Sequence, residues 1–348
     1  MPVPAVALHQ QTYCLGELFA GAGGMALGAS KAEFDGNGLS HVWINDIDKD
    51  ACKTFIHNLH IDKTGVFCCD ASKVNFGRLP PIDGLVFGFP CNDFSVVGEK
   101  LGMAGQFGGL YQWGVRALRA QKPLFFVAEN VGGLATSGNA MEIITTALRR
   151  SGYEVSKQLY RFEEYGVPQS RHRIVFIGFR NDLRISYEHP EPTTKDNPVS
   201  SSAALDGIPS DANNNELTNQ SQIVIERLKH IRPGENVFTA KLPDHLQLNM
   251  KSNAKISQIY RRLNPDKPSY TVTGSGGGGT HIYHWKEHRA LTNRERARLQ
   301  SFPDSFEFLG GKESVRRQIG MAVPPKGARV IFESVLKVLV ERGIGSQC

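Results

Sequence analysis

Short apolar runs, separated by turn residues and amphipathic stretches, occupy the first half of the chain. They predict strands near residues 14–20, 41–44, 65–70, 84–89 and 123–131, with helices beginning near Met25 and spanning about 110–120 and 140–151. The run at 123–131 has no polar alternation, as expected for a strand covered on both faces. Because strands and helices alternate, we expect an α/β fold with a mostly parallel sheet and helices on both faces.

The pattern changes after a further predicted strand at residues 174–179. Residues 191–215 are rich in Pro, Ser and Asn, and periodicity is weak as far as residue 282. A helix near 326–341 is expected to fold back beside the first strand. We therefore predict a larger domain made of residues 1–181 and 310–348, and a smaller, irregular domain made of residues 182–309.

The composition is that of a soluble globular protein. Of the 348 residues, 40% are hydrophobic and 21% are charged, and no run of about 18 apolar residues exists. The first ten residues lack the features of a secretory signal, so we expect a cytoplasmic protein without membrane contact. The six cysteines form no CxxC pair and no zinc-type spacing with histidine, so we expect reduced thiols and neither a metal cluster nor a disulfide framework.

Positive charge is concentrated in one part of the chain. The formal net charge is only +6, but residues 251–298 contain ten Lys and Arg against three Asp and Glu. This local excess favours a polyanionic partner such as nucleic acid. The alternative is an ordinary basic face in contact with solvent.

A glycine-rich turn and two acidic residues indicate a cofactor site. Residues 21–24 follow the first predicted strand, and Asp46 follows the second, where a carboxylate can accept hydrogen bonds from ribose hydroxyls. A plain tight turn uses the same glycines. The pattern differs from GxGxxG and no GxxxxGK[ST] is present, so neither a nicotinamide site nor a phosphate loop is favoured. Asp70, after the third strand, either meets an adenine amino group or caps the next segment.

The fourth predicted strand ends in Pro90 and Cys91, which places a thiol at the rim of the sheet. Such a thiol is nucleophilic only as its thiolate, whereas the alternative is a small buried residue. The glycine-rich segment that follows, up to residue 110, is suited to closing over a substrate. Glu129, at the end of the fifth strand, either caps a Gly-Gly turn or faces a substrate beside Cys91. Arg171 and Arg173 alternate along an extended segment, so both can point to one side.

Taken together, these residues make the chain resemble the C5-cytosine-specific DNA methyltransferases of bacterial restriction-modification systems. Six motifs occur in the family's order, from about residue 15 to residue 325. They are FAGAGG at 19–24, GFPC at 88–91, ENV at 129–131, QSRHR at 169–173, RALTNRE at 289–295 and QIGMAVP at 318–324. Two departures are Asn92, where the family usually has Gln, and Met321, where it often has Asn; neither replaces a group that the reaction consumes.

The resemblance implies a Rossmann-like fold that binds S-adenosyl-L-methionine, and a smaller domain that recognises the DNA target. It implies methyl transfer to C5 of cytosine in a specific double-stranded sequence, through an adduct of Cys91 with C6 of a flipped-out base. Glu129 would hydrogen-bond N3 and the exocyclic amine. Arg171 and Arg173 would contact the base O2 or the catalytic region around it.

The expected contacts fall into two further groups. Cofactor contacts are expected from Phe19, Ala20, Gly21, Gly23, Gly24, Asp46, Ile47, Asp70, Ala71, Pro90, Ala322 and Val323. DNA contacts are expected from Ser95, Gly98, Arg261, Arg262, Thr271, Thr273, Ser275, Gly276 and Gly277. For this second group the alternative is a flexible surface loop.

Two other functions remain open at this point. One is an RNA (tRNA) cytosine-5 methyltransferase on the same scaffold, and the other is a catalytically silent DNA-binding regulator. We expect a monomer that uses no metal, with a separately encoded restriction endonuclease as a candidate partner. The recognition sequence does not follow from the motifs.

Overall fold

A computed structural model of the chain describes residues 10–89, 109–136, 139–248, 257–276 and 279–348. The chain divides into two compact units. The first contains residues up to Arg161, His172–Glu191 and Gly327–Cys348, and the second contains Phe162–Arg171 and Pro192–Lys326. The division thus falls about ten residues later than the predicted start of the small domain and 17 residues later than its predicted end. It also assigns the short segment that carries Arg171 to the second unit.

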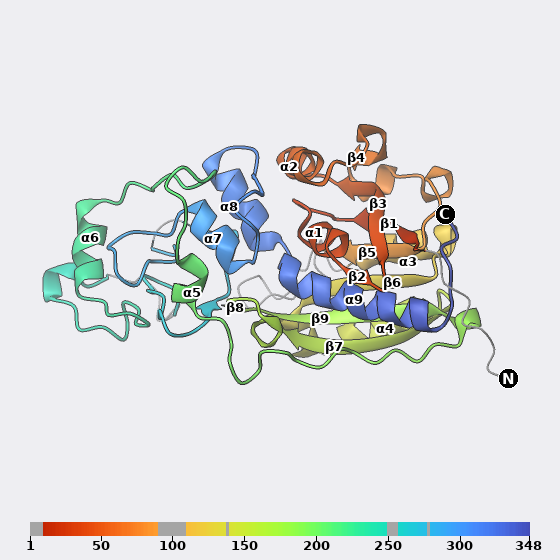
Figure 1. Ribbon diagram of the computed structural model, residues 1–348. Helices are drawn as coiled ribbons and strands as arrows, with labels where there is room; N and C mark the ends of the chain where they lie inside the picture. Colours follow the sequence, from red (N-terminus) through yellow and green to blue (C-terminus); the bar gives the residue numbers. More distant parts are fainter. Residues whose placement is uncertain (1–9, 90–108, 137–138, 249–256, 277–278) are drawn as a thin grey trace. The chain divides into compact units, whose positions relative to one another are not determined.

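The first unit is built on one mixed sheet with the strand order β2-β3-β1-β5-β6-β9-β7 (Figure 1). The remaining strand, β4, pairs with the C-terminal part of β3. The strands are β1 (Thr12–Leu18), β2 (Glu33–Phe34), β3 (Asn37–Asp46), β4 (Val66–Cys68), β5 (Gly84–Gly88), β6 (Phe125–Val131), β7 (Tyr153–Arg161) and β9 (His172–Arg180). The pairs among β1, β3, β4, β5 and β6 are parallel, whereas β2, β7 and β9 pair antiparallel. The predicted α/β fold is confirmed, with antiparallel strands at both edges of the sheet.

Helices cover both faces of this sheet because its central strands are apolar on both sides. Adjacent residues of β3 illustrate the alternation: Trp43 packs in the cluster with Phe87 and Leu118, whereas Ile44 packs with Ala26 and Phe55. The helices of the unit are α1 (Gly24–Ser30), α2 (Lys49–Leu59), α3 (Tyr111–Gln121), α4 (Ala140–Arg149) and most of α9 (Pro325–Glu341). Strand β6 is buried over its first six positions, as its unbroken apolar sequence predicts.

The C-terminal segment returns to the first strand, as predicted. The Tyr13 hydroxyl donates to the Ile344 carbonyl at 2.6 Å, and Asp83, which is fully buried, accepts from Cys14 N, Ser346 Oγ and Gln347 N at 2.6 to 2.9 Å. The large unit is therefore assembled from both ends of the chain.

Cys14 and Cys348 form a disulfide, with their Cα atoms 6.2 Å apart. The expectation of reduced thiols without a disulfide is thus wrong for this pair. Sequence spacing gave no sign of it, because the two cysteines are 334 positions apart and meet only after the C-terminal segment has docked beside β1. Asp83 lies beside the two sulfur atoms, but both sulfurs are used in the bond between them.

The second unit is irregular, as predicted, and is held together by short elements and buried polar side chains. Its elements are β8 (Gln169–Ser170), β10 (Ser269–Tyr270), α5 (Ser201–Leu205), α6 (Gln222–Lys229), α7 (Asn293–Leu299) and α8 (Lys312–Met321). Helix α7 begins with a capping box formed by Thr292 and Glu295. Arg294, fully buried, donates to the carbonyls of Asn213, Pro303 and Phe306, so it orders the loops around α7.

Among the described residues, no helix combines the length and apolar character that a membrane crossing requires.

The docking of the C-terminal segment on Asp83 can be tested by its contribution to stability. We expect Asp83→Ala to lower the free energy of unfolding by about 2–3 kcal/mol, because two backbone N–H groups and the Ser346 hydroxyl lose the buried charged acceptor that they share. Urea unfolding in reducing buffer would measure this loss without a contribution from the disulfide. Asp182→Ala, which removes an exposed carboxylate paired with Arg180, is the matched control and should change stability by less than about 0.5 kcal/mol. Equal losses in the two variants would contradict the docking role.

Candidate active site

The turn after β1 has the backbone geometry that a closely bound ligand requires. Phe19, Gly21 and Gly23 all have positive φ angles, of 57°, 55° and 92°. A side chain on Gly23 would collide with Leu59 and Phe55, whereas the space above Gly21 is open. Gly23 therefore permits close packing, and Gly21 leaves room for a ligand beside the backbone.

Asp46 lies at the end of β3 and is fixed by this turn. Its carboxylate accepts from Gly21 N at 2.7 Å through Oδ2 and from Asp48 N at 2.8 Å through Oδ1. Burial raises the pKa of Asp46, and the two backbone donors oppose that rise. Next to it, the apolar side chain of Ile47 is 69% exposed. The open space at Gly21, an oriented carboxylate and an exposed apolar surface fit a ligand that carries both a ribose and an adenine ring.

Asp70 caps a 3-10 turn at residues 71–73, so the second of the two sequence interpretations is realised in the described structure. Its side chain accepts from Ser72 N at 2.8 Å, and these hydrogen bonds with Ser72 lower the pKa of the exposed carboxyl. Ala71, directly after it, is buried. A capping carboxylate retains free lone pairs, so the cap leaves an adenine contact open.

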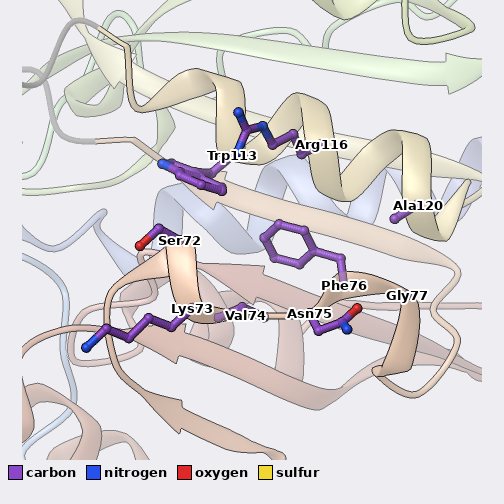
Figure 2. Close-up of a pocket in the computed structure, with 9 residues that line it drawn as sticks. All are labelled: Ser72, Lys73, Val74, Asn75, Phe76, Gly77, Trp113, Arg116 and Ala120. Atoms are coloured by element: carbon purple, nitrogen blue, oxygen red, sulfur yellow. The ribbon is translucent and has the colours of Figure 1, made fainter.

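A groove of about 480 Å³ adjoins this turn. It is lined by residues 72–77 and by three residues of α3: Trp113, Arg116 and Ala120. Figure 2 shows α3 lying across the Ser72–Gly77 segment, with the Phe76 ring between them. The Arg116 guanidinium lies 4.3 Å from the centre of the Trp113 ring.

Glu129 and Arg173 form an ion pair at the ends of adjacent strands. Arg173 Nε lies 2.7 Å from Glu129 Oε1, and the two side chains are only 13% and 12% exposed. The pair is brought together because β6 and β9 are antiparallel and Val131 is the register partner of Arg173. Glu129 Oε1 is buried and lies within hydrogen-bonding distance of the Arg173 guanidinium, which occupies only part of the carboxylate's acceptor capacity. The carboxylate is thus oriented and still able to accept from a substrate donor.

Asn130 connects this carboxylate to the end of β5. Its Nδ2 donates to the Phe89 carbonyl at 3.2 Å, and Gly88 is the register partner of Glu129. A side chain on Gly88 would lie 3.4 Å from Glu129 Oε2. Phe89 is the last described residue before Cys91. Sequence reasoning treated Asn130 only as part of a motif and missed this positioning bond, although a polar residue in an apolar strand was a signal.

Several predicted residues lie outside the described part of the chain. They are Pro90, Cys91, Ser95, Gly98 and Gly277.

Arg171 is buried in the second unit, at 2% exposure, and its Nη1 donates to the Val272 carbonyl at 3.2 Å. Arg173, two residues later, belongs to the first unit and pairs with Glu129. Although the two arginines are only two positions apart, they contact different sets of partners.

The predicted DNA-contacting arginines differ sharply in their surroundings. Arg262 is 4% exposed and donates to the carbonyls of Leu228, Ile231, His284 and other residues, so it holds loops together and is not available for DNA. The prediction that Arg262 contacts DNA is corrected on this ground. Arg261 is half-buried and stacks over Tyr270, with its Cζ 4.4 Å from the ring centre.

The remaining candidates belong to residues 271–276, which continue from β10. The Thr271 hydroxyl donates to the Ser170 carbonyl at 2.7 Å, and the Thr273 and Ser275 hydroxyls lie 2.9 Å apart. Ser275 is exposed and Gly276 is half-buried. The cofactor candidates of this unit, Ala322 and Val323, follow the end of α8 and are half-buried and buried.

The sheet, the glycine turn and the acidic strand ends define a Rossmann-like methyltransferase fold. Residues 13–337 match the family model described as C-5 cytosine-specific DNA methylase, and the chain belongs to this family. It is a DNA cytosine-5 methyltransferase.

Named relatives and solved structures agree with this assignment. The chain is 52% identical to the Type II methyltransferase M.BbvI of Brevibacillus brevis, over 92% of this chain and 90% of the relative. It is 42% identical to the Type II methyltransferase M.NgoFVII of Neisseria gonorrhoeae, over 92% and 86%. The structure resembles a prophage-encoded DNA modification methyltransferase of E. coli, with a TM-score of 0.73 and 26% identity over 94% of this chain and 99% of that one.

The different surroundings of Arg261 and Arg262 predict opposite behaviour on substitution. We expect Arg262→Gln to lower the free energy of unfolding by about 2–4 kcal/mol, because buried carbonyls lose a charged donor. The slope of log affinity for DNA against log salt concentration should stay unchanged for the folded fraction. Arg261→Gln should leave stability nearly unchanged and reduce the magnitude of that slope by about one, as expected for the loss of one phosphate contact. A reduced slope in Arg262→Gln with unchanged stability would reverse our correction.

Proposed function

We propose that this chain methylates C5 of cytosine in a specific double-stranded DNA sequence, with Cys91 as nucleophile and Glu129 as the group that engages the base. The observation that carries this is the oriented, buried Glu129 carboxylate beside Arg173. Glu129 lies near the end of β6, which pairs with β5, the strand that leads to Cys91. S-adenosyl-L-methionine would supply an electrophilic methyl group on a sulfonium. All other steps are assigned to residues of the chain and to the flipped-out base.

In the first step the Cys91 thiolate adds to C6 of the cytosine. A bond forms between sulfur and C6, and the electrons of the C5–C6 double bond become available at C5. Glu129, at N3 and the exocyclic amine, stabilises the charge that develops in the ring. Arg173 holds that carboxylate in place, since the two side chains are paired at 2.7 Å.

In the second step C5 takes up the methyl group. Loss of the proton from C5 to a base, for which a bound water is a candidate, restores the double bond, and the bond from sulfur to C6 breaks with release of the thiolate. No net oxidation or reduction takes place. Arg171, buried beside Val272, would order the segment next to the base O2.

For the cofactor we propose that Asp46 accepts from the ribose hydroxyls and that Ile47 contacts the adenine ring. Phe19, Ala20, Gly21, Gly23, Gly24, Asp70, Ala71, Pro90, Ala322 and Val323 would complete its surroundings. Support comes from the fixed Asp46 carboxylate, the open space at Gly21 and the exposed Ile47 side chain. DNA contacts would come from Arg261, Thr271, Thr273, Ser275 and Gly276, together with the Ser95, Gly98 and Gly277 positions.

We further propose that the enzyme acts as a monomer on DNA and not on tRNA. Its identities of 52% and 42% with Type II methyltransferases favour DNA. Transfer of labelled methyl groups to duplex DNA, with none to tRNA, would separate the two substrates. Bisulfite sequencing of DNA from cells that express the chain would give the target sequence.

The covalent step can be tested by trapping on a DNA duplex that contains 5-fluorocytosine, since the adduct cannot lose fluorine. We expect Cys91→Ser to form no stable adduct. Glu129→Gln should slow adduct formation by about 100-fold or more, because the stabilising carboxylate is lost. Glu142→Gln, which removes an exposed carboxylate on α4, is the control and should trap at the wild-type rate. Trapping by Cys91→Ser at the wild-type rate would exclude the proposed nucleophile.

The ribose role of Asp46 can be tested by calorimetry with S-adenosyl-L-methionine. We expect Asp46→Ala to weaken cofactor affinity by about tenfold or more, since a hydrogen bond to a charged acceptor is lost, while DNA affinity changes less than about twofold. Asp48→Ser is the matched control, because Asp48 caps α2 and a serine can replace that cap. Equal weakening of cofactor and DNA binding in Asp46→Ala would contradict a local ribose contact.

A further inference from the structure

Two fully buried glutamines in the second unit face each other through their amide groups. Gln169, on β8, and Gln300, at the end of α7, are both 0% exposed, and Gln169 Nε2 donates to Gln300 Oε1 at 2.8 Å. Burying an amide is costly unless each donor and acceptor finds a partner. The hydrogen-bond partners of these two amides indicate the role of the pair.

Each amide binds the backbone of a different segment. Gln169 Oε1 accepts from Val272 N at 2.7 Å, and its Nε2 also donates to the Leu299 carbonyl at 3.2 Å. Gln300 Nε2 donates to the carbonyls of Ile319 and Ala322, at 2.6 and 3.2 Å. The orientation of both amides is fixed, because the groups facing each Nε2 are acceptors only.

The segments joined in this way carry the proposed functional residues of the unit. Val272 lies between two candidate DNA-contacting residues, Thr271 and Thr273, and its carbonyl accepts from Arg171 Nη1 at 3.2 Å. Ala322 is a proposed cofactor contact. A hydrogen-bonded path therefore runs from Ala322 through Gln300, Gln169 and Val272 to Arg171.

The backbone packing around this path leaves little room for adjustment. A side chain on Gly320, in the last turn of α8, would overlap Thr273 C and Gly274 N, at 2.1 and 2.0 Å. The end of α8 thus lies directly against residues 273–274. Since backbone touches backbone at this point, a shift of either segment moves the other, and the two glutamine amides set their register.

We propose that Gln169 and Gln300 are positioning residues that act as one unit, holding Arg171 and residues 271–276 in a fixed register with the segment that contains Ala322. This inference rests on the proposed function, because it takes the roles of these segments from it. Because both glutamine side chains are fully buried, each acts on the rate only through the residues that it holds.

Adduct formation with a 5-fluorocytosine duplex, at saturating DNA and S-adenosyl-L-methionine, tests this proposal in the full-length enzyme. We expect Gln169→Met and Gln300→Met each to slow the rate constant at least tenfold, while the end point reports the competent fraction of the protein. The double variant should be slower than the slower single variant by no more than about twofold, because both changes break the same path.

The control is Asn214→Gly, in the same unit. Asn214 exchanges two hydrogen bonds with the Phe308 backbone, at 2.9 and 3.0 Å, and its φ of 63° suits glycine. It should lose stability but trap at the wild-type rate constant per competent molecule. If the methionine variants prove insoluble, Gln300→Asn replaces them, since it keeps a neutral amide but is one methylene too short to reach Gln169 and the carbonyls of Ile319 and Ala322 together. Its rate constant should also fall at least tenfold.

Two results would overturn the proposal. In the first, the glutamine variants lose stability but keep the wild-type rate constant, which would make the pair merely structural. In the second, the double variant slows by the product of the single effects, which would make the two residues independent. Failure of the wild-type enzyme to trap at all would instead contradict the proposed function and is visible before any glutamine variant is measured.

Discussion

A carboxylate at the end of a buried strand is the group around which the first unit is arranged. Glu129 follows apolar positions of β6 that are buried on both faces, so its charge would be costly without a partner. Arg173 supplies that partner because β9 runs antiparallel to β6 and begins where β6 ends. If β9 were parallel to β6, its C-terminal end would lie beside Glu129. Arg173, near the start of β9, would then lie at the opposite edge of the sheet. The antiparallel direction of β9 is therefore a requirement of the site.

At the edge of the sheet where the cofactor is proposed to bind, backbone groups orient the key side chain. Asp46 is oriented by two backbone N–H groups, one from the glycine turn after β1 and one from the start of α2. Because the turn and the carboxylate fix each other, the edge is formed before any ligand binds. Such preorganisation lowers the entropic cost of ligand binding.

The second unit achieves order without a large sheet. Its arginines mostly serve as multiple donors to loop carbonyls, as Arg262 and Arg294 do, and its two buried glutamines join segments that are far apart in sequence. A high local density of Arg therefore does not translate directly into a DNA-binding surface. Some of the positive side chains of residues 251–298 hydrogen-bond loop carbonyls. Others pair with carboxylates such as Glu295, which Arg289 binds at 2.8 Å through both Nη atoms.

The sequence by itself determined most strands and helices of the first unit, apart from β2, β7 and α2, as well as the edge at which its polar residues gather, and the family. These follow from local periodicity and from short motifs, which depend on neighbouring residues. It could not decide the roles of Arg262, Asp70 or the Cys14–Cys348 pair. Whether Arg262 meets DNA or loop carbonyls, and whether two cysteines 334 positions apart meet at all, depends on contacts between distant segments. Only tertiary structure decides such contacts, because hydrogen-bond partners of a long side chain are set by packing in space and leave no pattern along the chain.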